Sequence, residues 1–149
     1  SRISAQIPAW SFIERKLREL NWSNVLRELN LAISAFEENR MSDCCNNLRM
    51  ALITLLAKIY ELLEGCPPPI EPGKTPNPRS LLKPMQKLGL DDQSSKLILG
   101  IWSYVSERAH IEKRGGQPPS RREVKYGLQL IFSSIECLLN FLTELRNKS

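Results

Sequence analysis

The sequence has a single histidine, His110, and four cysteines with no CxxC spacing. One histidine rules out a metal site built from several histidines, and cysteines spaced in this way are typical of neither a zinc knuckle nor a disulfide framework. We therefore expect no metal and no other cofactor. We also expect reduced, partly buried thiols, as in a cytoplasmic protein, at Cys44, Cys45, Cys66 and Cys137.

Motifs for nucleotide binding and zinc proteolysis are also missing: there is no GxxxxGK[ST] loop, no GxGxxG after a strand and no HExxH. No apolar run approaches the roughly 18 residues that span a bilayer, and the start, SRISAQIPAWSFIERK, does not resemble a secretory signal. We expect a cytoplasmic protein without a membrane partner. Because the first residue is Ser and not Met, flanking domains stay an open alternative.

Strand patterns are nearly absent, because apolar residues recur at three- and four-residue steps along most of the chain. This spacing predicts a helix after Pro8, one from Ser23 to about Asn39, and one that starts at an N-cap of Ser42 or Asp43 and ends at Gly65. Three more helices are predicted: one at about 79–88, one from about Gln93 that Gly115 and Gly116 stop, and one at about 121–145. The expected inward-facing residues include Trp10, Ile13, Leu17, Leu20, Phe36, Leu48, Leu62, Leu63, Leu97, Trp102, Val105, Leu128, Leu139 and Leu145.

Residues 66–78 contain six prolines and cannot form regular helix. We interpret this segment as a long loop and not as a domain linker, because neither flanking part has enough helices to close a core. The prediction is an all-α, up-and-down bundle of four to five main helices plus a short helix, forming a single domain over residues 1–149.

Net charge is unevenly distributed: residues 1–66 are neutral, and the whole excess of +5 lies in 67–149. Ser120-Arg121-Arg122-Glu123 is typical of a capping box that starts a helix. Basic side chains gather on both sides of this point, and they fit either a solvated turn or an electrostatic site for RNA phosphates. The candidate nucleic-acid-binding residues are Lys113, Arg114, Arg121, Arg122 and Lys125, with Arg108 close by.

His110 lies where one predicted helix gives way to the next. Arg108 is two residues away, so the two side chains diverge by about 200° on a helix. Glu107 is three residues away and shares the face of His110, which predicts a hydrogen-bonded pair. The pair has two interpretations: His110 ends the helix and packs against the next one, or it acts as a general acid–base.

The segment SYVSERAHIEKRGGQPPSRREVKYGLQLIFSSIECLLNFL, residues 103–142, resembles the C-terminal half of HEPN-like helical domains, including their uncharacterised and abortive-infection-type branches. The resemblance rests on three features: a histidine near a helix end, a Gly/Pro turn, and a Ser-capped helix with a Leu-rich end. Residues 33–64 are similar to the early helical hairpin of the family.

The resemblance implies a helical bundle that forms a homodimer, and in active members a metal-independent RNase of toxin or defence systems. The arginine that pairs with the histidine in active members would fall at Ser103, Tyr104 or Val105, so only His110 matches. We therefore expect a non-catalytic module that acts in dimerisation, in docking a partner protein or flanking domain, or in RNA binding. The alternative is a metal-independent RNase that uses His110 with Arg108 or Arg114 at a dimer cleft, with Glu107 as a further candidate catalytic residue.

Overall fold

The structure, a computed structural model, describes residues 3–70 and 72–148. Position 71, inside the predicted proline-rich loop, lies outside the described residues. The elements are two short 3-10 helices, η1 (Ile3–Gln6) and η2 (Glu112–Arg114), and six α-helices: α1 (Trp10–Glu19), α2 (Ser23–Glu37), α3 (Met41–Glu64), α4 (Pro78–Lys87), α5 (Asp92–His110) and α6 (Arg121–Asn147). The all-α prediction is confirmed.

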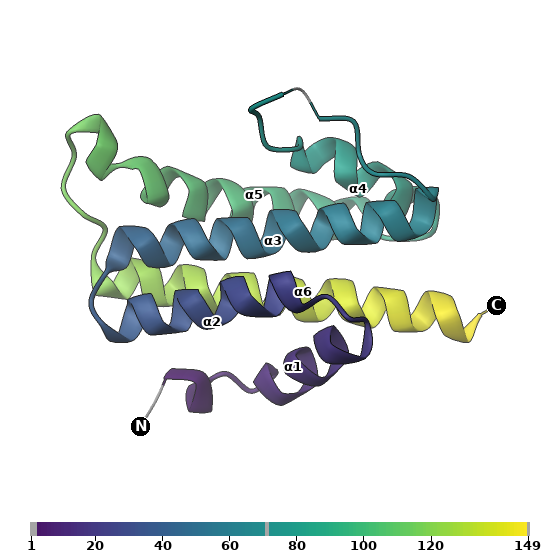
Figure 1. Cartoon of the computed structure of the whole chain (residues 1–149), viewed down its shortest axis with the longest axis horizontal. Coiled ribbons are helices and arrows are strands. Elements are labelled where there is room, and N and C mark those ends of the chain that lie inside the picture. Colours follow the sequence, from purple (N-terminus) through teal and green to yellow (C-terminus); the bar gives the residue numbers. More distant parts are fainter. Residues whose placement is uncertain (1–2, 71, 149) are drawn as a thin grey trace.

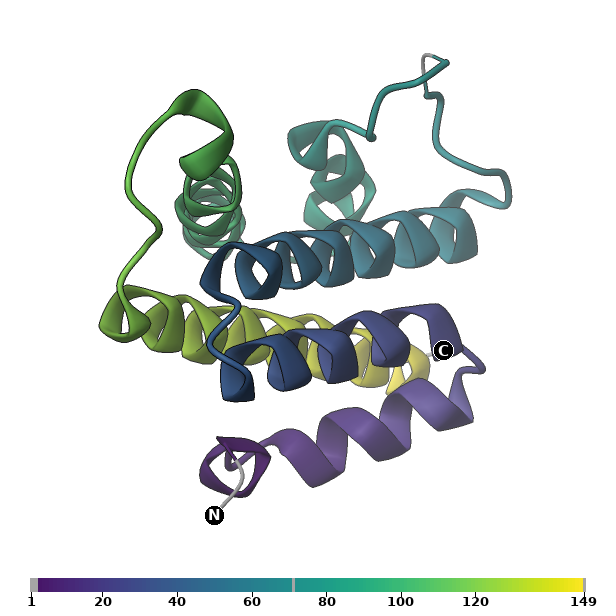
Figure 2. The same ribbon diagram turned by 60° about the vertical axis from the view of Figure 1, so that its left-hand side comes forward.

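The helices form a bundle in which α3 is central and packs against α2, α4, α5 and α6. Helices α2 and α5 run in one direction and α3 and α6 in the other (Figure 1), so the long helices alternate up and down. Helices α4 and α5 lie on one side of α3, and α1 lies at the far side beyond α2 (Figure 2). The HEPN-like identity of this bundle stays a prediction.

One hydrophobic cluster joins all six α-helices, with members such as Ile13, Leu52, Leu82, Ile101 and Ile131. The predicted apolar stripe of α6 is buried from Val124 to Leu142. By length and composition alone α6 could cross a membrane, since 18 of its residues have a mean hydropathy of 1.3. Half of that window is buried in the bundle, and the core helix of a folded domain meets the same test.

Helix starts follow the sequence closely, with one exception. The Ser120 and Glu123 capping box is present, and Asp91 caps α5 by accepting the N–H of Ser94 at 2.8 Å. The predicted cap at Ser42 or Asp43 is wrong. Helix α3 begins at Met41 without a side-chain cap, because the chain already turns at Asn39, where φ is +62°.

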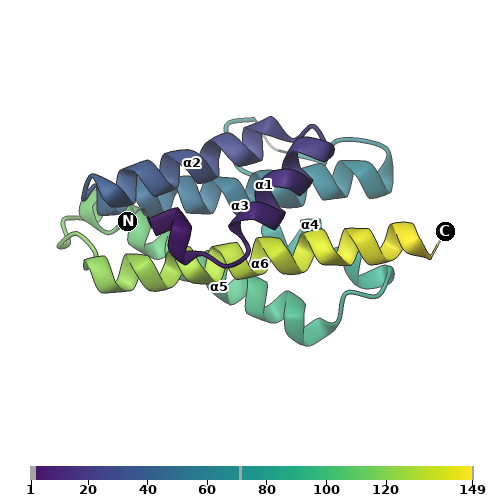
Figure 3. The same ribbon diagram turned by 90° about the horizontal axis from the view of Figure 1, so that it is seen from below.

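Two leucines predicted to face inward are exposed instead: Leu62 by 49% and Leu97 by 64%. Leu62 lies in the last turn of α3. Leu97 lies in the first turns of α5, the part of that helix that diverges from α6 (Figure 3). Helical periodicity marks a face but cannot show where a neighbouring helix ends.

Candidate nucleic-acid interface

The predicted site residues lie at one end of the bundle, where α5 ends, η2 follows, α6 begins and the chain turns between α2 and α3 (Figure 1). Two glycines shape the connection. Gly115 has a φ of +84°. Gly116 lies so close to Ile111 that an added Cβ would be 2.8 Å from Cγ1 of Ile111. The turn therefore needs both glycines to carry the chain from η2 to α6.

Arg108 is fixed by intramolecular contacts on the α6 side of α5. Its Nε donates to Oε2 of Glu123 at 2.9 Å, and an Nη donates to the carbonyl of Tyr104 at 3.1 Å. The guanidinium also lies over the Tyr104 ring, 3.5 Å from its centroid. These contacts give Arg108 a structural role, so its predicted catalytic role with His110 has no support in the geometry.

His110 is the last residue of α5 and is half-buried, whereas Glu107 is exposed. Among the described residues there is no hydrogen bond between them, so the predicted Glu107–His110 pair is wrong. The pKa of His110 is lowered from its ordinary value of 6.5, first by partial desolvation and then by the positive charges of Arg49, Lys113 and Arg114.

Arg121 is also engaged within the chain. One Nη donates to the carbonyl of Phe36 at 3.1 Å and to Oδ1 of Asn39 at 2.6 Å. The guanidinium lies 4.0 Å from the centroid of the Phe36 ring. Arg121 thus adds a second hydrogen bond to a carbonyl that already accepts the N–H of Asn39, and it joins the end of α2 to the start of α6.

The other four predicted cations, Lys113, Arg114, Arg122 and Lys125, are all exposed. Within residues 3–70 and 72–148, none of them forms an ion pair or a side-chain hydrogen bond. We call this group of four the basic corner. Of the nearby acids, Glu112 accepts a hydrogen bond from Ser42, and Glu123 is held by Ser120 and Arg108. A third acid, Glu37, lines a hollow together with Arg121 and Lys125. The basic corner is therefore a cationic surface whose members form no ion pair among the described residues.

The sequence did not single out Arg49 of α3, whose positive charge contributes to the lowered pKa of His110. In the sequence Arg49 lies between Leu48 and Met50 in an apolar stretch. A single arginine there indicates only the border between the buried and exposed faces of a helix. The proximity of Arg49 to a residue of α5 depends on how two helices cross, and no local pattern contains that information.

The cysteines fit the predicted picture of free thiols. Cys44 and Cys45 are buried, Cys66 and Cys137 are exposed, and all four are free. Burial raises the pKa of Cys45 to about 12 and that of Cys44 further still, so neither thiol has the lowered pKa of a nucleophile. In the described part of the chain no group of three or more His, Cys, Asp or Glu could hold a metal ion.

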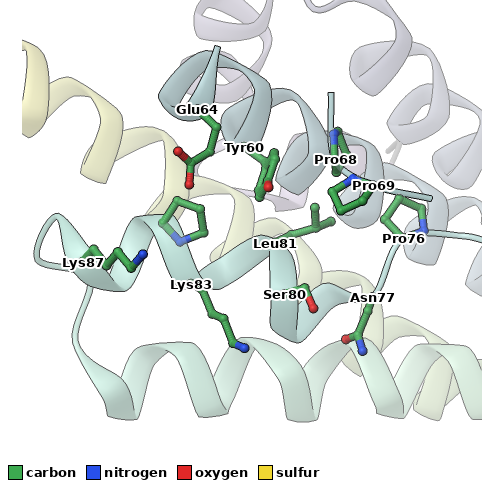
Figure 4. Close-up of a pocket in the computed structure, with 11 residues that line it drawn as sticks. Tyr60, Glu64, Pro68, Pro69, Pro76, Asn77, Ser80, Leu81, Lys83 and Lys87 are labelled. Carbon is green, nitrogen blue, oxygen red and sulfur yellow. The ribbon is translucent and has the colours of Figure 1, made fainter. Parts of the chain in front are cut away.

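A pocket of about 300 Å³ lies at the opposite end of the bundle, between the proline-rich loop, α3 and α4. Tyr60, Pro68, Pro69 and Pro84 give it apolar walls, and Glu64 and Lys87 reach toward it from α3 and α4 (Figure 4). None of the predicted site residues lines it. The basic corner and this pocket are therefore separate features.

No protein-family model, curated protein sequence or solved structure matches the chain.

Proposed function

We propose that this chain is a non-catalytic HEPN-like helical module that binds RNA through the basic corner. The observation that supports it is the gathering of Lys113, Arg114, Arg122 and Lys125, all exposed and all without an acidic partner in the described part of the chain. Unpaired cations at one place attract phosphates, since each phosphate contact releases a condensed counterion.

The start of α6 contributes to the same surface. Arg122 and Lys125 lie in its first turns, where the helix dipole also favours an anion. Such contacts fix the position of a phosphate backbone without reading its bases. The proposed binding is therefore sequence-independent and strongly dependent on salt.

The test is retardation of a labelled single-stranded RNA at low salt by the full chain and by two charge-matched variants. Arg122→Glu with Lys125→Glu should weaken the retardation strongly. Lys83→Glu with Lys87→Glu makes the same change of charge at the opposite end of the bundle and should leave most of it. Loss of two phosphate contacts should also lower the slope of log affinity against log salt by about 1.4. Equal effects of the two variants would show that RNA binding depends on the net charge of the protein and not on the basic corner.

A second candidate function, metal-independent RNA cleavage by His110, has one observation in its favour. The lowered pKa of His110 keeps the imidazole neutral near pH 7, which is the form that a general base needs. The arginine in this route would be Arg49 or Arg114, because Glu123 holds Arg108. The test is cleavage of RNA in EDTA by the chain and by His110→Ala, and equal cleavage by both would exclude the route.

Dimerisation, docking of a partner domain and a place in a defence or toxin-type system rest on the family resemblance alone.

A further inference from the structure

Arg49 is a half-buried arginine without a counterion. One Nη donates to Oδ1 of Asn46 at 3.0 Å, while its Nε is buried and has no hydrogen-bond partner. Among the described residues no carboxylate forms an ion pair with it, and burial lowers its pKa. A partly desolvated charge without a carboxylate partner is unfavourable in the free protein, and an anion bound near the guanidinium would compensate it.

Three further basic groups lie at the end of α5, the helix that packs against α3, and in η2, which follows it. His110 comes from the end of α5, and Lys113 and Arg114 come from η2. Arg49, Lys113 and Arg114 are all close enough for their charges to lower the pKa of His110, and no carboxylate offsets them there. We call Arg49, His110, Lys113 and Arg114 the recessed cation cluster, since Arg49 and His110 lie deeper than the exposed lysine and arginine.

Among the described residues, the acids nearest in the sequence form no ion pair with this cluster. Glu112 directs its carboxylate to the hydroxyl of Ser42, at the first turn of α3. Glu107 is exposed and makes no hydrogen bond to His110 among the described residues. The cluster therefore carries three positive charges with His110 neutral, and four with His110 protonated.

We propose that the recessed cation cluster binds the terminal phosphomonoester of an RNA strand, with Arg49 as the residue that holds it. This inference rests on the proposed function and assigns it a preference for strand ends. Two properties favour an end over an internal phosphate. A terminal phosphate reaches near two negative charges at neutral pH, and it can approach the half-buried Arg49 from one side, whereas an internal diester has one charge and is flanked by two nucleosides.

Guanidinium geometry suits this ligand. A planar guanidinium can present two N–H groups to two phosphate oxygens, which an ammonium cannot do. Protonation would make both ring nitrogens of His110 donors, and the bound dianion would favour that form. Lys113 and Arg114 would contact the phosphate from the solvent side and belong to the basic corner as well, so the strand would continue toward α6.

The experiment compares one short RNA in three forms: with a phosphate at its start, with a phosphate at its end, and with hydroxyls at both ends. Binding of each to the full chain, to Arg49→Gln and to Arg27→Gln is measured by fluorescence anisotropy. Arg27 is an exposed arginine of α2 and serves as the matched control. One phosphorylated form should bind the full chain and Arg27→Gln roughly tenfold more tightly than the hydroxyl form, as expected for a charge-assisted contact. Arg49→Gln should lose this preference and keep its affinity for the hydroxyl form.

A second measurement separates the phosphate group from the RNA. In the ¹H–¹⁵N spectrum of the arginine side chains, inorganic phosphate should shift the Nε–H resonance of Arg49 and leave that of Arg27 in place. Equal binding of all three RNAs with an unmoved Arg49 resonance would overturn the inference and leave the proposed function standing. Absence of RNA binding would remove the proposed function, and the inference about RNA ends would fall with it even if phosphate moved the Arg49 resonance.

Discussion

Glu123 is bound on both sides: its Oε2 accepts the Nε–H of Arg108 at 2.9 Å, and its Oε1 accepts the backbone N–H of Ser120 at 3.1 Å. One carboxylate thus ties the end of α5 to the start of α6 while it also completes the capping box. Tyr104 adds to this link, since its hydroxyl donates to the carbonyl of Glu123 at 3.3 Å. These contacts orient the two elements that carry the basic corner.

Glutamate 123 offers a graded test of that link. Glu123→Gln keeps a capping-box residue and loses the ion pair, so it should lower the free energy of unfolding by less than about 1 kcal/mol. Glu123→Ala loses both and should cost about 1 to 2 kcal/mol. Urea unfolding followed by circular dichroism measures both values. Equal losses for the two variants would show that the capping contact contributes nothing beyond the ion pair.

Arg121 and Arg122 are neighbours with opposite expected roles. Arg121→Ala removes two hydrogen bonds and a cation–π contact at the end of α2, so it should lower the free energy of unfolding by about 1 to 3 kcal/mol. Arg122→Ala, at an exposed position without partners among the described residues, should change it by less than about 0.5 kcal/mol. Thermal unfolding of both variants makes the comparison, and the opposite order of stabilities would contradict the assignment.

The helices could be predicted from the sequence because their signals are local. The spacing of Val124, Leu128 and Ile131 shows a buried stripe, and the pairing of Ser120 with Glu123 shows where α6 starts. The start of α3 could not be predicted in the same way, since a left-handed turn at Asn39 set it and not a capping side chain.

The position of the candidate site in the bundle could be predicted from the sequence, but the roles of its individual side chains could not. Clustered charge marked the right end of the bundle, yet it could not separate Arg121, held by Phe36 and Asn39, from Arg122, which is free of such contacts among the described residues. Nor could the charge pattern show that Arg49 of α3 lies close enough for its charge to affect His110. These distinctions depend on which helices cross, and charge spacing along one helix does not contain them.

Acid should weaken two helix starts together. Hydrogen bonds from Ser120 lower the pKa of Glu123 below its ordinary 4.5, and those from Ser94 lower the pKa of Asp91 below 3.8. Because both pKa values are depressed in the folded state, the stability that the ionised groups contribute is complete above the ordinary values and is lost as pH falls through the folded ones. The urea midpoint should therefore fall between about pH 5 and pH 3, and fall less in a Glu123→Gln, Asp91→Asn double variant, whose caps do not titrate. Parallel curves for the two proteins would assign the acid sensitivity to other carboxylates.

Arg49 gives the sharpest separation of stability from binding. Since its charge is half-buried without a counterion and its Nε is unsatisfied, Arg49→Met should leave the free energy of unfolding unchanged or raise it by about 1 kcal/mol. Arg108→Met, which leaves Glu123 without its partner, should instead lower it by roughly 1 to 2 kcal/mol. Added phosphate should raise the melting temperature of the unchanged chain and of Arg108→Met, and have little effect on Arg49→Met, because a ligand stabilises only the folded form that binds it. A large loss of stability in Arg49→Met would contradict this assignment. It would mean that Arg49 stabilises the packing between α3 and α5 and is not a destabilising charge in the free protein.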